Sequence, residues 1–226
     1  SGTGNLTSST NDLGNLTENG VALTVMDALT LAGNLTRTAG SIQTGANDLT
    51  VGGDIAWTAG TLTCGGILSL NGGGAQAVNL TSTTLTHMSI AKSGGTATLG
   101  SAVVLSGNLT LGGGGLVTSG NNLSLTGNLT RTTGTLDTGA GNLTVGGNIT
   151  WTAGTLTCGG IMTLNGGGAQ AVNLASATLN HFTVAKGGGT ATLGAALVLS
   201  GDVTISGGTL AAAGNNLTVA GSWNNS

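Results

Sequence analysis

The sequence has no proline and no tyrosine, and among its 226 residues it holds one phenylalanine, three tryptophans and two cysteines. A collagen helix needs proline and a glycine at every third position, so it is excluded. The two cysteines, Cys64 and Cys158, do not make a disulfide framework. A chain this poor in aromatics must build its core from leucine, isoleucine, valine and alanine, which suits a narrow and regular interior.

Charge is equally scarce, with four basic and seven acidic residues and a formal net charge of -3. Four cations are too few for an electrostatic footprint on nucleic acid or on an anionic membrane, so we expect neither partner. No apolar run reaches the roughly 18 residues of a membrane span, so we expect no membrane insertion. The chain starts at Ser1 without a methionine, and we interpret it as a processed product or a segment of a longer protein.

What the sequence does contain is a long internal repeat. Residues 33–110 align without gaps to residues 127–204, at an offset of 94, and 57 of the 78 aligned positions are identical. Substitutions between the copies keep apolar positions apolar, as in the change from Met88 to Phe182. Both copies therefore bury the same side chains. We divide the chain into a divergent N-terminal part (1–28), repeat unit one (29–122), repeat unit two (123–216) and the start of a further coil (217–226).

A finer rhythm runs inside each unit, because short segments such as Leu49-Thr50-Val51 and Leu143-Thr144-Val145 alternate apolar and polar residues. This period of two is typical of a strand with one buried face. Glycine and asparagine clusters separate the segments, and both residues tolerate the positive φ of tight corners. With 45 glycines in the chain, a helix is strongly disfavoured.

Strands this short lack a core of their own, but they acquire one when they are stacked as the coils of a solenoid. The sequence therefore predicts an all-β fold, a parallel β-solenoid (β-helix) of about 19 residues per coil and roughly 12 coils. Five such coils would make one 94-residue unit. The alternative is a β-sandwich of hairpins, for which Asn19-Gly20 and Asn71-Gly72 are the nearest hairpin turns.

Several short motifs recur in the same order in both units. In unit one and at the start of unit two they are Gly60-Thr61-Leu62, Leu70-Asn71-Gly72-Gly73, Gln76, His87-Met88-Ser89-Ile90, Lys92, Gly94-Gly95-Thr96, Thr98-Leu99-Gly100 and Asn142-Leu143-Thr144-Val145-Gly146-Gly147. This order resembles that of bacterial secreted Gly/Asn/Thr-rich repeat proteins, which are found in surface fibres and adhesins. The resemblance covers the chain from about Leu29 onward. It implies export and an elongated β-solenoid, and it implies no enzyme activity.

The acidic residues argue against catalysis as well. Glycosidase-like chemistry on a β-helix needs carboxylates clustered on one face, but the acids here are thinly spread: Asp12, Glu18, Asp27, Asp48, Asp54, Asp137 and Asp202. Two of them, Asp48 and Asp54, are replaced by asparagine in the second unit. We therefore expect no enzyme, no catalytic residues and no cofactor.

For the histidines, cysteines and cations that recur once per unit, we expect structural roles. His87 and His181 lack neighbours at metal-ligand spacing, so we expect polar residues at a strand surface or corner and no metal site. Cys64 and Cys158 are expected to be small core-facing residues or unpaired thiols, with an inter-chain bridge as the alternative. The four cations, Arg37, Arg131, Lys92 and Lys186, are expected to be solvated surface charges.

The three tryptophans, Trp57, Trp151 and Trp223, leave two interpretations open. Exposed tryptophans would make a platform for sugars, whereas packing over the corners of the coils would be structural. We favour packing.

Asparagine is the most informative polar residue. Asn-x-Thr/Ser sequons start at Asn5, Asn15, Asn34, Asn79, Asn108, Asn122, Asn128, Asn142, Asn148, Asn216 and Asn224. We expect that asparagines before Leu-Thr strands form corner ladders in which stacked amides bond from coil to coil. In a host with N-linked glycosylation, the same residues are acceptor sites.

The ends of the chain carry no charged cap or amphipathic helix, although a monomeric solenoid covers its open ends. We therefore expect copies to stack head to tail through Ser1, Gly2, Thr3, Trp223, Asn224, Asn225 and Ser226, which makes the chain its own partner. The predicted function is a structural subunit or segment of an extracellular filament on the cell surface. The alternative is the stalk or glycan-binding module of a secreted adhesin, with surface glycans as partners.

Overall fold

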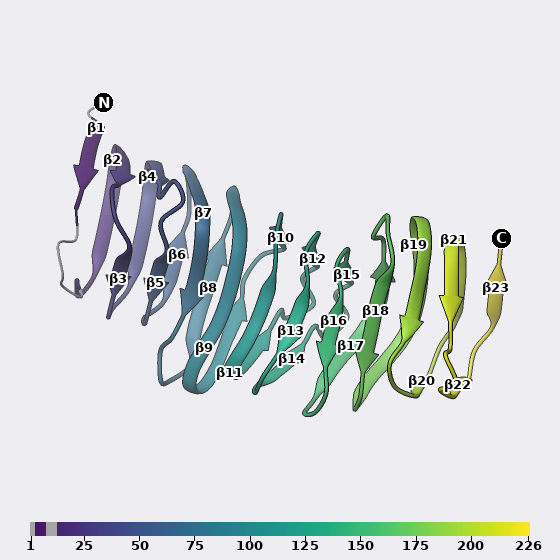
Figure 1. Ribbon diagram of the computed structural model, residues 1–226. Coiled ribbons are helices and arrows are strands. Elements are labelled where there is room, and N and C mark those ends of the chain that lie inside the picture. Colours follow the sequence, from purple (N-terminus) through teal and green to yellow (C-terminus); the bar gives the residue numbers. More distant parts are fainter. Residues whose placement is uncertain (1–2, 8–12) are drawn as a thin grey trace.

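The structure, a computed structural model, describes residues 3–7 and 13–226. These residues form a rod of stacked strands, with the first strands at one end and the last strands at the other (Figure 1). The described residues include no helix of the length and apolarity needed to cross a bilayer.

The 23 strands are all short or bent. They are β1 (Thr3–Leu6), β2 (Leu16–Val25), β3 (Leu29–Leu31), β4 (Leu35–Gln43), β5 (Leu49–Val51), β6 (Ile55–Trp57), β7 (Thr61–Leu70), β8 (Gln76–Leu80), β9 (Thr83–Leu99), β10 (Val103–Leu105), β11 (Leu109–Val117), β12 (Leu123–Leu125), β13 (Leu129–Arg131), β14 (Thr135–Asp137), β15 (Leu143–Val145), β16 (Ile149–Trp151), β17 (Leu156–Leu164), β18 (Gln170–Leu174), β19 (Ala177–Leu193), β20 (Leu197–Leu199), β21 (Val203–Ala211), β22 (Leu217–Val219) and β23 (Trp223–Asn225).

The pairing of these strands defines three faces. The first face includes β3, β5, β13, β16 and β18. The second includes β6, β8, β14, β20 and β22. The third includes β1, β10, β12, β15 and β23. The longer strands turn corners, so that β9 contributes to all three faces.

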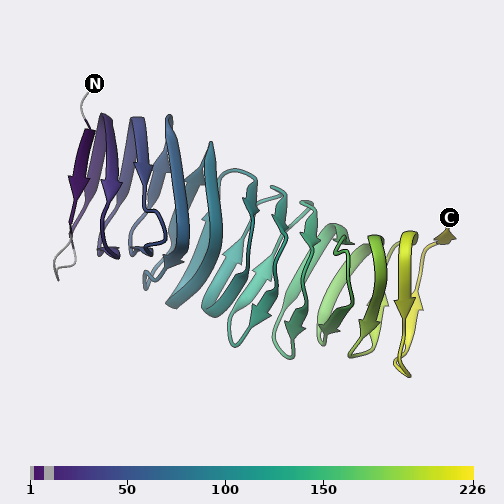
Figure 2. The same cartoon turned by 45° about the horizontal axis from the view of Figure 1, so that its top comes forward.

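The predicted parallel β-solenoid is confirmed. Each strand pairs in parallel with the strand one coil away, about 20 residues along the chain, and there are about 11 turns. At about 4.8 Å per coil the rod is about 53 Å long. The hairpin sandwich is excluded for the described residues, because every pairing among them is parallel. Figure 2 shows the coils winding about one axis.

Alternation along each strand decides what is buried. In β5, Leu49 and Val51 point inward and are buried while Thr50 points outward, and β15 repeats this with Leu143 and Val145. Neighbouring coils place aliphatic side chains directly above one another, as in the register of Leu29 with Leu49. One continuous aliphatic core therefore runs the length of the rod, and the burial of this apolar surface drives the stacking.

The boundaries of the sequence units at residues 28, 122 and 216 leave no mark on this stack. The ladder passes from β10 to β12 across the second boundary and from β20 to β22 across the third. The described strands of the divergent part also belong to the stack, since β1 pairs with β2 and β2 pairs with β4.

The prediction of five coils per unit is wrong. Leu62 lies on the third face and its counterpart Leu156 lies on the second. Between them the chain moves on by fourteen faces, and since one coil has three faces, this is four and two-thirds coils. Equivalent residues of the two units therefore lie on different faces. Trp57 belongs to the second face and Trp151 to the first. The rotation follows from a coil of about 20 residues, which does not divide 94 evenly.

Candidate functional surface: the corner ladders

The predicted ladders exist, with a different hydrogen bond from the one expected. The side-chain oxygen Oδ1 of Asn108 accepts a hydrogen bond from the backbone N–H of Asn128, one coil on, at 2.8 Å. Asn128 accepts in the same way from Asn148 at 2.7 Å. The ladder thus joins side chain to backbone, and not amide to amide. Each step provides an acceptor for a backbone N–H at the corner that is not used in the hydrogen bonds between the strands.

Other ladders occupy other corners. Asn15 accepts from the N–H of Asn34, Asn34 from Asp54, and Asp54 from Ala77. Another runs from Asn122 to Asn142 and on to Ile161. Residues with no oxygen acceptor on the side chain, such as Ala77, end the ladder. The corner that carries a ladder moves with the repeat, because equivalent residues lie on rotated faces.

The ladders explain why aspartate and asparagine replace one another between the units. Asp48 accepts from the N–H of Ile67 at 2.8 Å, and its counterpart Asn142 accepts from Ile161 at 2.9 Å. Only the acceptor oxygen is used, and both side chains supply it. Several of the scattered acids are thus ladder members. Within the described ranges, no three His, Cys, Asp or Glu residues gather to hold a metal ion.

We expect Asn128→Ala to lower the free energy of unfolding by about 1 kcal/mol, because the Asn148 N–H loses its acceptor. Asn128→Asp keeps the acceptor oxygen, as Asp54 does at a ladder step, and should unfold close to the natural chain. Urea denaturation of the two variants measures this difference. An equal loss in both would show that the ladder bond is not what matters at this corner.

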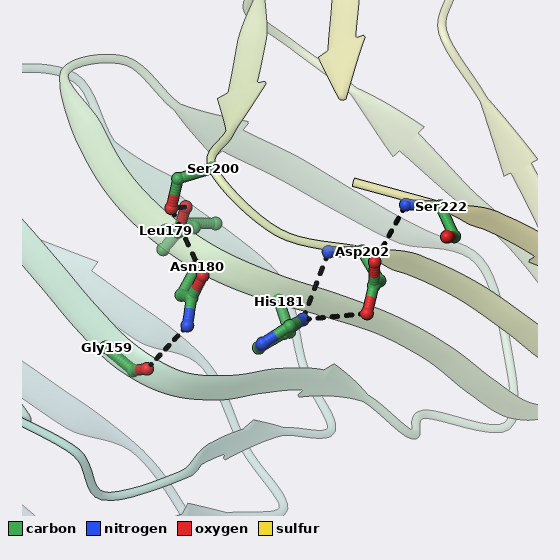
Figure 3. A network of polar contacts seen from close by, with 7 residues as sticks. All are labelled: Gly159, Leu179, Asn180, His181, Ser200, Asp202 and Ser222. Carbon is green, nitrogen blue, oxygen red and sulfur yellow. Dashed lines mark hydrogen bonds and ion pairs between the residues drawn. The ribbon is translucent and has the colours of Figure 1, made fainter. Parts of the chain in front are cut away.

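The histidines begin two of the ladders, which agrees with their expected place at a corner. Nδ1 of His87 accepts a hydrogen bond from the N–H of Asn108 at 2.9 Å, and Nδ1 of His181 accepts from Asp202 at 3.0 Å. Figure 3 shows the second case, where Asp202 continues the ladder to the N–H of Ser222. The carboxylate of Asp202 also lies 3.4 Å from Nδ1 of His181.

The prediction of solvated cations is wrong for three of the four. Arg37 is 0% exposed, Lys92 3% and Lys186 4%, while Arg131 is half-buried. The guanidinium of Arg37 lies 5.3 Å from the ring centroid of Trp57, and Arg131 lies 5.5 Å from that of Trp151. These contacts are cation–π pairs one coil apart. The known coil length of about 20 residues would have predicted them, because Arg37 is directly in register with Trp57.

Each buried lysine is held by a glutamine. Nζ of Lys92 donates to Oε1 of Gln76 at 3.1 Å, and the Gln76 amide nitrogen donates to the carbonyls of Val51 and Gly53. Lys186 and Gln170 repeat the arrangement at 3.0 Å. Glutamine thus connects a buried charge to backbone carbonyls of an earlier coil, which offsets part of the cost of its desolvation.

Burial lowers the pKa of both lysines, and near Lys92 the carboxylate of Asp54 partly opposes this change. Asn148 stands at the corresponding place near Lys186. When the folded pKa of a lysine lies below its unfolded value, the unfolded chain binds more protons between the two values, so stability rises with pH there. We expect the natural chain to gain stability relative to Lys186→Met as the pH rises from 8 toward 10.5, by about 1.4 kcal/mol per unit of lowered pKa. Urea midpoints of both proteins across this range measure the gain. A difference that is independent of pH would contradict the lowered pKa.

The cysteines and two of the tryptophans are interior. Cys64 and Cys158 are buried free thiols, as expected, and burial raises the pKa of each. Trp57 and Trp151 are fully buried, and their indole N–H groups donate to the corner carbonyls of Gly60 and Gly154. Packing is therefore confirmed for these two. Trp223 is 53% exposed.

The sequon asparagines lie mostly at the surface. Exposed ones are Asn5, Asn15, Asn34, Asn122, Asn128, Asn142, Asn148, Asn216 and Asn224, while Asn79 and Asn108 are half-buried. Of the expected junction residues, Thr3 lies in β1 and the last strand β23 contains Trp223, Asn224 and Asn225, all exposed. Ser1 and Gly2 lie outside the described residues, as does Asp12.

One open hollow lies on the second face, with a volume of about 490 Å³. Its lining residues include the small side chains of Ala56, Ala77 and Thr98 and the polar side chains of Asp54 and Asn121. The Oδ1 atom of Asn79, which also lines it, is buried without a hydrogen-bond partner. The hollow has no aromatic lining residue, so it lacks the usual platform for a sugar ring.

Comparison of the chain with known protein families, with curated proteins and with solved structures finds no match.

Proposed function

We propose that the chain is a structural segment of an extracellular filament or surface fibre, without enzyme activity. The observation that carries the proposal is the rotation of the repeat by one face per unit. Because of this rotation, the cation–π pairs of the two units lie on different faces of the rod, Arg37–Trp57 on the second and Arg131–Trp151 on the first. A binding module concentrates its chemistry on one side, whereas a load-bearing rod benefits from equal reinforcement on all sides.

The end coils support assembly along the axis. At the first coils, core-facing Leu6, Leu13 and Leu16 are only half-buried, and at the last coils Leu217 and Val219 are too. Their counterparts inside the rod are fully buried, such as Leu109 and Leu125. Among the described strands, β1 pairs only with β2 and β23 pairs only with β21, so each is an edge strand that a further coil can extend. Further coils, supplied by a second copy stacked head to tail or by more of the same chain, would cover both.

Trp223 is the most telling residue for this contact. It is in register with the buried core residue Val203, and its counterpart in unit two is the fully buried Leu129. A large apolar side chain at a core position with 53% exposure fits a contact that another coil completes. The extracellular location rests on the resemblance of the repeat to secreted proteins.

Electron microscopy and sedimentation of the purified chain test the proposal. We expect filaments with a 4.8 Å axial repeat, whose formation Trp223→Ser weakens strongly. Val104→Ser is the matched control, because Val104 is 65% exposed on the side of the rod. A chain that stays monomeric at high concentration, or equal effects of both variants, would contradict stacking through this end.

The adhesin-stalk function is the second candidate, and the observation that favours it is the buried Oδ1 of Asn79, which has no hydrogen-bond partner and lines the hollow beside Asp54. A glycan array would decide between the two. Binding that Ala56→Trp abolishes, by filling the hollow, would move the glycan-binding module to first place.

A further inference from the structure

The two histidine corners occupy equivalent positions of the repeat. They differ in the residue on the next coil that donates its backbone N–H to the histidine. His87 and His181 occupy the same position of the repeat, and each accepts a backbone N–H from the next coil through Nδ1. The donor residue is Asn108 in the first case and Asp202 in the second. The chain thus contains a natural pair of sites with and without a carboxylate.

Both corners require a neutral imidazole. Nδ1 accepts only when its proton is absent, so the single ring proton lies on Nε2. All other ladder steps use an amide or carboxylate oxygen, for example Asn108 toward Asn128. An amide oxygen stays an acceptor at any mildly acidic pH, whereas histidine takes up a proton in this range.

Protonation turns Nδ1 into a donor that faces the N–H of the next coil. At His87, none of the described side chains that line the hollow beside the ring is titratable, and the carboxylate of Asp48 lies beyond Ile67, whose N–H it accepts. The residues around its ring are Ile67 on β7, Met88 and Ser89 on its own strand, Gly107 and Asn108 before β11, and Thr110 on β11. None of these side chains titrates. The corner would hold two donors facing one another, which weakens the step between the coils.

At His181 the same event is compensated. Ile161 on β17 takes the place of Ile67, and Asn180 precedes the histidine on β19. The Asp202 carboxylate lies 3.4 Å from Nδ1 of His181 (Figure 3). A protonated Nδ1–H donates to this carboxylate as a charge-assisted hydrogen bond.

We propose that His87 is an acid-labile step in the coil ladder and that Asp202 protects the equivalent step at His181. Mild acid then loosens the rod at one defined corner while the other corner stays closed. The acid-sensitive step is thus confined to the His87 corner, because Asn108 stands there and Asp202 stands at the His181 corner.

Amide hydrogen exchange of the full chain tests the proposal residue by residue. Protection factors, corrected for the intrinsic pH dependence of exchange, are compared between pH 7.5 and pH 5.0. We expect the Asn108 amide to lose protection by about tenfold, and the Asp202 amide by less than about threefold. The Asn128 amide is the internal control, because its acceptor does not titrate.

Two substitutions convert each corner into the natural sequence of the other and so provide matched variants. Asn108→Asp should abolish the loss at residue 108, and Asp202→Asn should create a loss of about tenfold at residue 202. His87→Asn puts Oδ1 where Nδ1 stands and should make the protection at Asn108 independent of pH. The proposal would be overturned if the Asn108 amide kept its protection at pH 5.0 or lost it equally in His87→Asn. It would also be overturned if Asn108→Asp and Asp202→Asn left the protection at residues 108 and 202 unchanged.

Discussion

Gly60→Ala is expected to destabilise the rod by about 3–5 kcal/mol, which would be among the largest effects of any single substitution. Gly60 has φ +84°, and a Cβ at this position would lie 2.1 Å from the carbonyl oxygen of Gly40 in the preceding coil. The obstacle is backbone that belongs to another corner, so it does not move aside without separating the coils.

Gly120→Ala separates the two causes of that cost. Gly120 has φ +82°, but an added Cβ there meets nothing within 4 Å. Its expected cost is only the left-handed backbone strain, about 1–2 kcal/mol. Urea denaturation of both variants gives the comparison. Equal losses would mean that the close stacking of corners contributes nothing.

The second large effect is expected for Trp151→Ala, at about 3–5 kcal/mol. Trp151 is fully buried on the first face and its ring stacks with Arg131. Removing it leaves a cavity in a core made mainly of aliphatic side chains, and it deprives the half-buried Arg131 of its aromatic partner.

Trp223→Ala is the matched control, because Trp223 is half exposed in the last strand. In a monomeric preparation we expect a loss below about 1 kcal/mol. Thermal and urea unfolding of both variants at low protein concentration measure the difference. A small loss at Trp151 would contradict the close packing of the rod.

Much of the site was within reach of the sequence. The ladders were predicted from asparagines that precede Leu-Thr strands, and the structure places Asn108, Asn128 and Asn148 one above another. The identity of the donor was not predictable, because a backbone N–H at a corner is invisible in a residue pattern. The histidines were predicted at a strand surface or corner, and the structure places them at corners, although nothing in the sequence showed that they begin ladders.

The buried cations were missed for a specific reason. A residue's burial in a solenoid depends on which residue lies one coil away, and an estimate of 19 residues per coil puts the wrong residue there. With the true spacing of about 20, Arg37 meets Trp57. Lys92 likewise reaches Gln76, 16 residues before it, because the chain turns between them, at Ser82 with its φ of 55° and again within β9.

The sequence by itself determined the parallel β-solenoid, because period-two alternation, glycine corners and a near-identical repeat leave a stack of short strands as the way to bury the leucines. Only the tertiary structure decided the exact length of each coil, and with it the face of the rod on which each residue lies. Coil length is the sum of three strands and three corners, and a corner's length depends on how its backbone packs on the corner of the neighbouring coil. That packing makes the 94-residue unit four and two-thirds coils long, and it turns each copy of the chemistry toward a different side of the rod.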